Sequence, residues 1–309
     1  MINYMTIGGI TLDDTVFQYG KTVFDAPGGN GIYSALGARI WSEGVGIVSR
    51  IGSDYPQKNL ETLENSGVDI RGIQQVDFPS QHLWLLYEQN GSRQFIFHST
   101  SGTPDSEIDP IPSQIPQDYL DARMAHLSAM GFDSQHAIAS FLHEKGTVYS
   151  YDVTQASLMM ESRQYADNFA TTNSKLFLPS IEEVEAIYGK KALLPLLAKI
   201  AHYGPQYFAV KMGAEGSVVY DAQKEQAIRI PIFPVEVCDP TGAGDAYCGG
   251  FMVGFCETGS VLEAGLYGTV SASFAIQEVG SFHLLQVGKK EAIKRINYLR
   301  KNVEFLNSK

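Results

Sequence analysis

Short apolar runs and amphipathic segments alternate along this chain. Apolar runs that stop at glycine are typical of buried strands, and apolar residues three or four positions apart are typical of helices. Strands that alternate with helices indicate parallel βαβ units. Strands are expected at residues 4–10, 45–51, 68–76, 125–129 and 147–152, at the start of 176–185, and on both sides of the glycines at 213 and 216. Helices are expected at the end of 26–39, at 56–65, 134–144 and 165–169, at the end of 176–185, and at 257–277 and 288–302.

Two stretches interrupt this alternation with patterns typical of hairpins. Residues 15–25 alternate in polarity around a glycine. Residues 81–88 and 93–98 flank Asn90-Gly91, a dipeptide that favours a tight β-turn. These strands are rich in aromatic residues, and apolar strands of this kind need a cover.

The composition is that of an ordinary globular protein. Of the 309 residues, 44% are hydrophobic and 18% are charged, which excludes a disordered or fibrous chain and allows one large α/β domain or two modest ones. The formal net charge of −11 argues against a nucleic acid or an anionic membrane as partner. We find no charged-then-apolar leader and no apolar run long enough to span a bilayer. The three cysteines are odd in number and lack metal-like spacing, so a reduced, cytoplasmic protein is expected.

Residues 237–255 carry the most distinctive chemistry. Gly242, Ala243 and Gly244 leave the backbone bare where a loop becomes a helix, and the free N–H groups of a helix N-terminus attract anions. Asp245 follows at once, although its charge would repel a phosphate. The position makes chemical sense if Asp245 takes the proton from a hydroxyl that attacks a phosphoryl group held at this turn. The alternative is an acid that only stabilises the helix dipole, beside glycines that only permit a tight turn.

The length of the motif decides between these two interpretations. Residues 239–245, which read Asp-Pro-Thr-Gly-Ala-Gly-Asp, closely resemble the C-terminal signature of the PfkB/ribokinase family of carbohydrate and nucleoside kinases. The resemblance implies that Gly242, Ala243 and Gly244 form the anion hole for the transferred phosphoryl group. It implies that Asp245 is the base that activates the acceptor hydroxyl, and that Thr241, Gly242 and Gly244 contact the nucleotide.

A second glycine-rich loop opens a helix near the start of the chain. Residues 26–39 resemble the N-terminal signature of the family, in which a Gly-Gly pair leads into a helix that faces the phosphate acceptor. The resemblance places Gly28, Gly29, Asn30 and Tyr33 at the acceptor site. Many members have Asn where this chain has Tyr33, and an aromatic ring offers a sugar or a base a stacking face instead.

An acid follows the first strand, at the strand end where open α/β sheets bind ligands. Spacing alone leaves Asp13 as an ordinary turn residue, whereas the resemblance assigns it to the hydroxyl groups of a sugar. The resemblance also implies that the strands near 15–25 and 80–98 form a β lid over the acceptor site and often a dimer interface. Either use would bury Trp84 and Phe95.

Two further positions resemble parts of the nucleotide and metal sites of the family. Lys211 and Gly213 match the turn that faces the phosphates and ribose of ATP, although an exposed hairpin lysine is the common case. Glu183 matches the glutamate that organises Mg²⁺ through water, in a motif where this chain has Ser180 instead of Asn. The same two residues also read as a capping box at the start of a helix.

Two other segments refine the expected substrates. Asp152 resembles the start of a family segment that continues toward an arginine, and this chain has no such arginine. Because a fixed arginine is a natural phosphate ligand, its absence disfavours a phosphorylated acceptor. Residues 271–280 resemble the segment that borders the adenine pocket and often a potassium site.

The sequence therefore predicts one ribokinase-like three-layer α/β/α domain over residues 1–309, with a mainly parallel sheet and a small β-sheet lid. We expect transfer of the γ-phosphoryl group of ATP, with Mg²⁺, to a hydroxymethyl of an unphosphorylated sugar, polyol or nucleoside. The lid is also a candidate surface for a homodimer, and the sequence leaves the oligomeric state open. A non-catalytic sugar or nucleotide sensor on the same fold is the alternative. A dinucleotide-dependent enzyme ranks lower, because no Gly-x-Gly-x-x-Gly follows the first strand.

Overall fold

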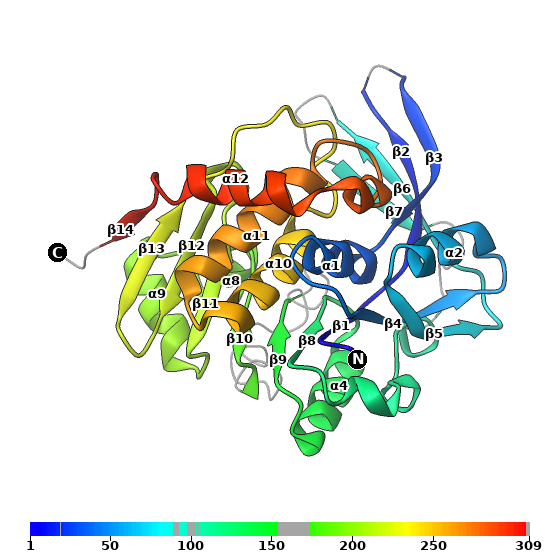
Figure 1. Ribbon diagram of the computed structural model, residues 1–309, viewed down its shortest axis with the longest axis horizontal. Helices are drawn as coiled ribbons and strands as arrows, with labels where there is room; N and C mark the ends of the chain where they lie inside the picture. Colours follow the sequence, from blue (N-terminus) through cyan, green and yellow to red (C-terminus); the bar gives the residue numbers. More distant parts are fainter. Residues whose placement is uncertain (19, 89–92, 98–102, 104, 154–172, 307–309) are drawn as a thin grey trace.

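A ten-stranded sheet runs through the computed structural model, which describes residues 1–18, 20–88, 93–97, 103, 105–153 and 173–306 (Figure 1). From one edge to the other its strands are β14 (Glu304–Leu306), β13 (Gln226–Ile230), β12 (Ser217–Asp221), β11 (Tyr207–Lys211), β10 (Leu176–Phe177), β9 (Tyr149–Tyr151), β8 (Met124–Leu127), β1 (Tyr4–Ile7), β4 (Val45–Gly52) and β5 (Asp69–Val76). Neighbours from β11 to β5 run parallel, whereas β12, β13 and β14 are added antiparallel. Every residue of β1, which lies between β8 and β4, is buried, as parallel strands covered on both faces require.

Helices cover both faces of this sheet and make a three-layer α/β/α fold (Figure 1). The two faces bury separate apolar cores, one around Phe251 and the other around Leu142. One layer consists of α1 (Asn30–Arg39), α2 (Gln57–Asn65), α10 (Ala243–Thr258), α11 (Val261–Ala275) and α12 (Lys289–Leu299). The other consists of α4 (Phe132–Lys145), α8 (Ile181–Tyr188) and α9 (Leu193–His202), and the short α3 (Asp105–Ile108) precedes β8.

Helix α10 lies between α1 and α11 at unusually close range. A Cβ added at Gly249 would lie 1.9 Å from the Ser34 carbonyl oxygen of α1, and one added at Gly250 would lie 2.4 Å from the Ser271 Oγ of α11. No side chain fits at either position, so the glycines allow the three helices to pack. The packing fixes the N-terminal end of α10, at Gly242, against Tyr33 in the first turn of α1.

A separate four-stranded sheet projects from one end of the molecule (Figure 1). Its order is β3 (Thr22–Gly28), β2 (Thr11–Val16), β6 (Gln81–Tyr87) and β7 (Arg93–Phe97). The two outer pairs are antiparallel hairpins, and β2 and β6 join them in parallel. The small β-sheet that the sequence predicted is therefore present. Its first hairpin, β2 and β3, extends from Thr11 to Gly28 instead of the predicted 15–25. The turn at 89–92 and residue 98 lie outside the described residues.

The expected burial of the lid aromatics is not reached within one chain. Phe95 is 53% exposed, and Trp84 is partly exposed beside Phe24. The sequence analysis also missed α9, in which Pro195 lies in the first turn, where no N–H partner is lost. The helix expected at 165–169 lies outside the described residues. Within the described ranges, none of the helices combines the length and apolarity that crossing a membrane requires.

Candidate active site

The start of α10 presents an open backbone N–H group. Gly242 precedes the helix in the left-handed conformation, with φ 75°. The Ala243 N–H donates to the Pro240 carbonyl at 3.3 Å, whereas the Gly244 N–H has no backbone acceptor among the described residues. The Asp245 N–H interacts with the carboxylate of the same residue and lowers its pKa. Free N–H groups at a helix start attract anions, so Gly244 offers such a group here, and the anion hole at Gly242, Ala243 and Gly244 stays a prediction. We call residues 242–245 the anion turn.

Asp245 is a partly buried carboxylate in the first turn of α10. Burial raises the pKa of its carboxyl to about 6, and the charge of Asp152 raises it further, while Lys211 and Arg93 act in the opposite direction. Asp245 is thus ionised at neutral pH and is a stronger base than an ordinary aspartate. Both properties suit a group that accepts a proton from a hydroxyl.

Asp13 lies on β2, at the base of the lid, and is buried. Burial raises the pKa of its carboxyl to about 6, although the Thr11 hydroxyl donates to Oδ1 at 2.7 Å. A Cβ added at Gly28 would lie 2.0 Å from the Asp13 Oδ2, so the carboxylate can lie there only beside a glycine. The structure thus brings Asp13 and Gly28 together, as the sequence analysis predicted.

Gly29 and Asn30 connect backbone segments near the start of α1. Gly29 has φ 95°, and a Cβ there would lie 2.4 Å from the Gly9 carbonyl oxygen. The Asn30 Oδ1 accepts from the Gly9 N–H at 2.7 Å, and its Nδ2 donates to the Ala129 carbonyl at 2.6 Å. Asn30 therefore ties the loop after β1 to the loop after β8, and its amide keeps one further donor and one further lone pair for an acceptor.

Tyr33, the predicted stacking residue, is only 2% exposed. Its ring lies so close to the anion turn that a Cβ added at Gly242 would approach it to 2.2 Å. Burial and the charges of Asp13, Asp239 and Asp245 raise the pKa of its hydroxyl well above the usual value. The ring thus packs beneath the anion turn, and the structure does not present it as a free stacking surface.

Two side chains of the lid reach the loop before the anion turn, and the sequence analysis missed both. The Tyr87 hydroxyl donates to the Asp239 Oδ1 at 2.5 Å, and the same oxygen accepts from the Thr241 N–H at 2.8 Å. The Arg93 Nη1 donates to the Thr241 Oγ1 at 2.5 Å. The Asn-Gly dipeptide before Arg93 predicts the hairpin that carries this residue. Nothing in the sequence indicates which part of the protein the hairpin contacts.

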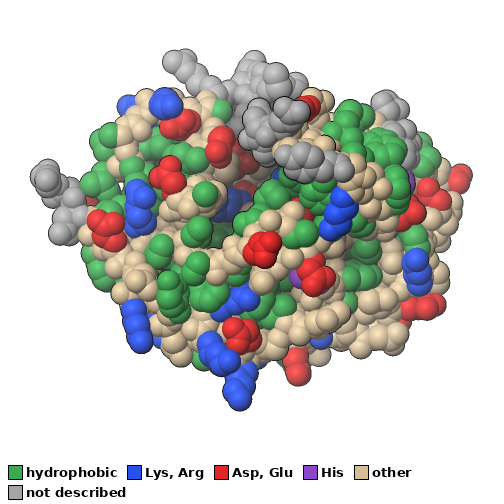
Figure 2. Space-filling view, turned by 90° about the horizontal axis from the view of Figure 1, so that it is seen from above, with side chains coloured by type: hydrophobic (Ala, Val, Ile, Leu, Met, Phe, Trp, Pro, Cys, Tyr) green, Lys and Arg blue, Asp and Glu red, His purple; other side chains and the backbone are tan. Residues whose placement is uncertain are grey.

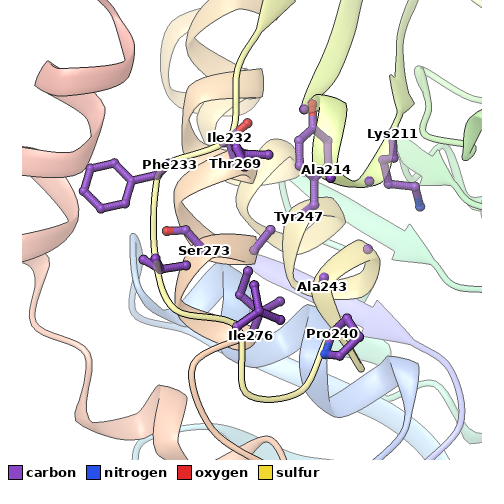
Figure 3. Close-up of a pocket in the computed structure, with 16 residues that line it drawn as sticks. Lys211, Ala214, Ile232, Phe233, Pro240, Ala243, Tyr247, Thr269, Ser273 and Ile276 are labelled. Carbon is purple, nitrogen blue, oxygen red and sulfur yellow. The ribbon is translucent and has the colours of Figure 1, made fainter. Parts of the chain in front are cut away.

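A cavity of about 350 Å³ lies beside the anion turn, within the size range of small-molecule sites. The molecule is hollowed on the face shown in Figure 2, with hydrophobic side chains around the hollow. In Figure 3, Lys211 and Phe233 lie toward opposite ends of the cavity lining. Thr241 and Gly242 do not line the cavity. The lining comprises Lys211, Gly213, Ala214, Gly216, Ile232, Phe233, Val235, Val237, Pro240, Ala243, Gly244, Tyr247, Thr269, Ala272, Ser273 and Ile276.

Lys211 is not an exposed hairpin lysine. Its Nζ donates to the Asp152 Oδ2 at 2.5 Å, and both side chains are largely buried. Although burial opposes its charge, Asp152, Cys248 and Glu183 hold the pKa of the ammonium well above the usual value. A charged lysine therefore stands at the end of the cavity nearest the anion turn.

Glu183 forms the predicted capping box at the start of α8. Its Oε2 accepts from the Ser180 N–H at 2.7 Å, and its own N–H donates to the Ser180 Oγ at 3.3 Å. Burial, and then the charge of Asp152, raises the pKa of its carboxyl to about 7. One carboxylate oxygen is thus committed to the backbone.

The described residues form one cluster of three metal-ligating side chains, and it lies in the lid. It consists of Asp14, Asp25 and His82, where the His82 Nε2 is 3.1 Å from the Asp14 Oδ2. Glu183 belongs to no such cluster in the part of the chain that the structure describes. A metal ion at Glu183 would need most of its ligands from substrate and water.

Comparisons with known proteins provide separate evidence on the family and the fold. Residues 5–286 match the model of the pfkB family carbohydrate kinases. The chain is 29% identical over 256 residues to a cytidine kinase of Thermococcus kodakarensis, covering 82% of this chain and 89% of the relative. A nucleoside kinase of Burkholderia thailandensis solved with inosine has a similar fold, with TM-score 0.76 and 16% identity over 96% of this chain and 97% of the other. So does an Escherichia coli protein assigned as a ribokinase II, solved with ATP and Mg²⁺, with TM-score 0.79 and 22% identity over 96% of this chain and all of the other.

Proposed function

The chain belongs to the pfkB family of carbohydrate kinases, which are phosphotransferases with an alcohol group as acceptor, and we propose that residues 1–309 act as one domain that transfers the γ-phosphoryl group of ATP to a hydroxymethyl group. The observation that carries the proposal is the cavity of small-ligand size that ends at Ala243 and Gly244, next to Asp245. The ring of Tyr33 packs against Gly242, and the charges of both Asp13 and Asp245 raise the pKa of its hydroxyl, which supports an acceptor held by Asp13 near the base.

In the proposed reaction, Asp245 removes the proton of the acceptor hydroxyl while its oxygen attacks the γ-phosphorus in line with the leaving group. The bond from the γ-phosphorus to the bridging oxygen breaks, and ADP leaves with that electron pair. The open N–H group of Gly244 stabilises the charge on the transferred phosphoryl group. Arg93 has a neutral partner in Thr241, so its guanidinium charge stays available to the same group.

Magnesium fits this site only as an ion that arrives with the nucleotide. Mg²⁺ keeps several waters and usually takes one or two carboxylates together with substrate phosphates. Glu183 has one carboxylate oxygen committed to Ser180, and its other oxygen fits a water of the ion. When bound, the ion supplies positive charge that offsets the charge of the polyphosphate.

The acceptor we propose to test first is a nucleoside. The relatives named above include a cytidine kinase and a nucleoside kinase solved with inosine. Sugars and polyols remain acceptors of the same chemical class, and the missing arginine after Asp152 favours an unphosphorylated one. Potassium near 271–280 stays a prediction. A homodimer through the lid also stays a prediction, supported by the exposed Phe24, Phe95 and Phe97.

The test is ADP release from Mg-ATP with nucleosides, sugars and polyols, for the natural chain and for Asp245→Asn. We expect turnover on one acceptor and a loss of about 10²–10⁴ in kcat in the variant, the range that a general base contributes. Calorimetric binding of ATP should be preserved. Asp133→Asn is the matched control, because Asp133 is also a first-turn acid, on α4, and a dipole role would give both variants the same small effect.

Near-normal turnover by Asp245→Asn would refute the assigned base. Binding of ATP or a nucleoside by the natural chain, with no turnover on any acceptor, would favour the sensor. The one observation that points toward a sensor is the commitment of Glu183 to its capping box.

A further inference from the structure

Asp152 is a buried carboxylate that stands directly behind Lys211 and has no role in the reaction described so far. It follows β9, at the carboxyl end of the parallel sheet, and is 5% exposed. Its Oδ2 accepts from Lys211, and its Oδ1 accepts from the Val153 N–H at 3.0 Å. Both carboxylate oxygens are thus held in place.

The backbone around Asp152 is also fixed. Its N–H donates to the Leu127 carbonyl at 3.0 Å, and its carbonyl accepts from the Gln135 Nε2 at 2.9 Å. Gln135 is anchored in turn by the Ser128 carbonyl at 2.7 Å and by the Tyr151 hydroxyl at 3.1 Å. The carboxylate is therefore a rigid support, set by the sheet and by α4.

Lys211 spans the distance from β11 to the anion turn. Its Nζ lies 3.5 Å from the Cys248 Sγ as well as 2.5 Å from Asp152. Burial raises the pKa of the Cys248 thiol well above the usual value, so the sulfur is a neutral partner. An ammonium has three N–H donors, and these two contacts occupy two of them. A Cβ added at Gly244 would lie 3.6 Å from the Nζ, so the third donor is within reach of an anion bound at the turn.

We propose that Asp152 is a positioning residue, which holds the ammonium of Lys211 beside the anion turn so that its remaining N–H donor meets the transferred phosphoryl group. The inference rests on the proposed kinase function. A lysine side chain is long and flexible, so ordering it costs conformational entropy. A partner that orders it before the substrate binds removes this entropic cost from the reaction. A purely structural ion pair is the competing interpretation, since a buried pair that loses one partner destabilises a fold.

A double-mutant cycle separates the two interpretations. Asp152→Asn, Lys211→Met and the double variant are compared with the natural chain for kcat, for the KM of the acceptor, and for melting temperature. If Asp152 acts through Lys211, Asp152→Asn lowers kcat about ten- to a hundredfold, as a misplaced group does. The double variant is then no slower than Lys211→Met alone, and the KM of the acceptor stays unchanged.

The matched control is Asp221→Asn. Asp221 is equally buried and pairs with Lys224 at 2.9 Å, but it lies at the far end of β12, roughly 13 Å along the strand from the residue that pairs with Lys211. This variant should lose some stability and keep kcat.

The proposal is overturned if folded Asp152→Asn keeps kcat within twofold of the natural chain, or if the losses of the two single variants multiply in the double variant. If Asp152→Asn does not fold, Asp152→Glu takes its place, because it keeps an ion pair with Lys211 but displaces the ammonium. An unchanged kcat in Asp152→Glu would also overturn the proposal. Asp245→Asn in the same series keeps the two failures apart, because its full activity would refute the kinase mechanism itself.

Discussion

Alanine at Gly242 should destabilise the protein through two effects that the structure separates. The first is backbone conformation, because Gly242 has φ 75° and a side chain in the left-handed region costs about 1–2 kcal/mol. The second is contact with Tyr33, whose ring would lie 2.2 Å from the new Cβ. Forcing an extra carbon into a packed interior costs about 1–3 kcal/mol.

Gly259, at the other end of the same helix, isolates the first effect. It has φ 67°, and no atom lies within 4 Å of a Cβ added there. Alanine also lowers the conformational entropy of the unfolded chain, which stabilises the folded state of either variant by about 0.4–1 kcal/mol. Gly259→Ala should therefore cost about 1 kcal/mol, and Gly242→Ala about 2–4 kcal/mol.

The assay is chemical denaturation of the natural chain and both variants, with kcat measured at the same time. Gly259→Ala should retain full kcat, whereas Gly242→Ala should lose most of it, since the anion turn shifts with the displaced ring. Equal losses of unfolding free energy in the two variants would show that Tyr33 is not the reason for glycine at 242.

Two further predictions concern the charges around Asp245. Arg93→Met should lower kcat about 10²-fold, the scale for the loss of one donor to the transferred phosphoryl group. Arg93→Lys should restore only part of kcat, because lysine lacks the planar fork of the guanidinium. A normal kcat in Arg93→Met would refute the role of Arg93 in stabilising this group. The acid limb of kcat/KM should lie near pH 6, because burial raises the pKa of Asp245 to about 6 and only the ionised form is a base. Lys211 lowers that pKa, so Lys211→Met should move the limb to higher pH, and a limb that moves down or stays in place would contradict the arrangement.

The sequence predicted the layers of the fold well because their signals are local. The parallel sheet and the helices that cover it follow from runs and periodicities, such as the buried β4 and the capped α8. The anion turn was predicted because Gly242 and Asp245 are close in sequence and their chemistry depends on a single helix end. Asp13 and Gly28, which the resemblance assigned to the acceptor site, lie in contact.

The contacts that sequence reasoning missed all join segments that are far apart along the chain. Arg93 and Thr241 are 148 residues apart, and Lys211 and Asp152 are 59 residues apart. The amide of Asn30 donates to the Ala129 carbonyl, 99 residues away. No periodicity encodes which partner a buried polar group finds, since this depends on how the sheet and the lid come together.

These long-range contacts also bear on how an acidic protein holds a polyphosphate. The described site brings three carboxylates near Tyr33, and its buried lysine is already paired with Asp152. Positive charge must therefore arrive with the substrate or with the lid, because an uncompensated anion is costly in a buried site. Arg93 enters from β7 and contacts Thr241 in the loop before the anion turn, so the four-stranded sheet brings one positive charge to this loop.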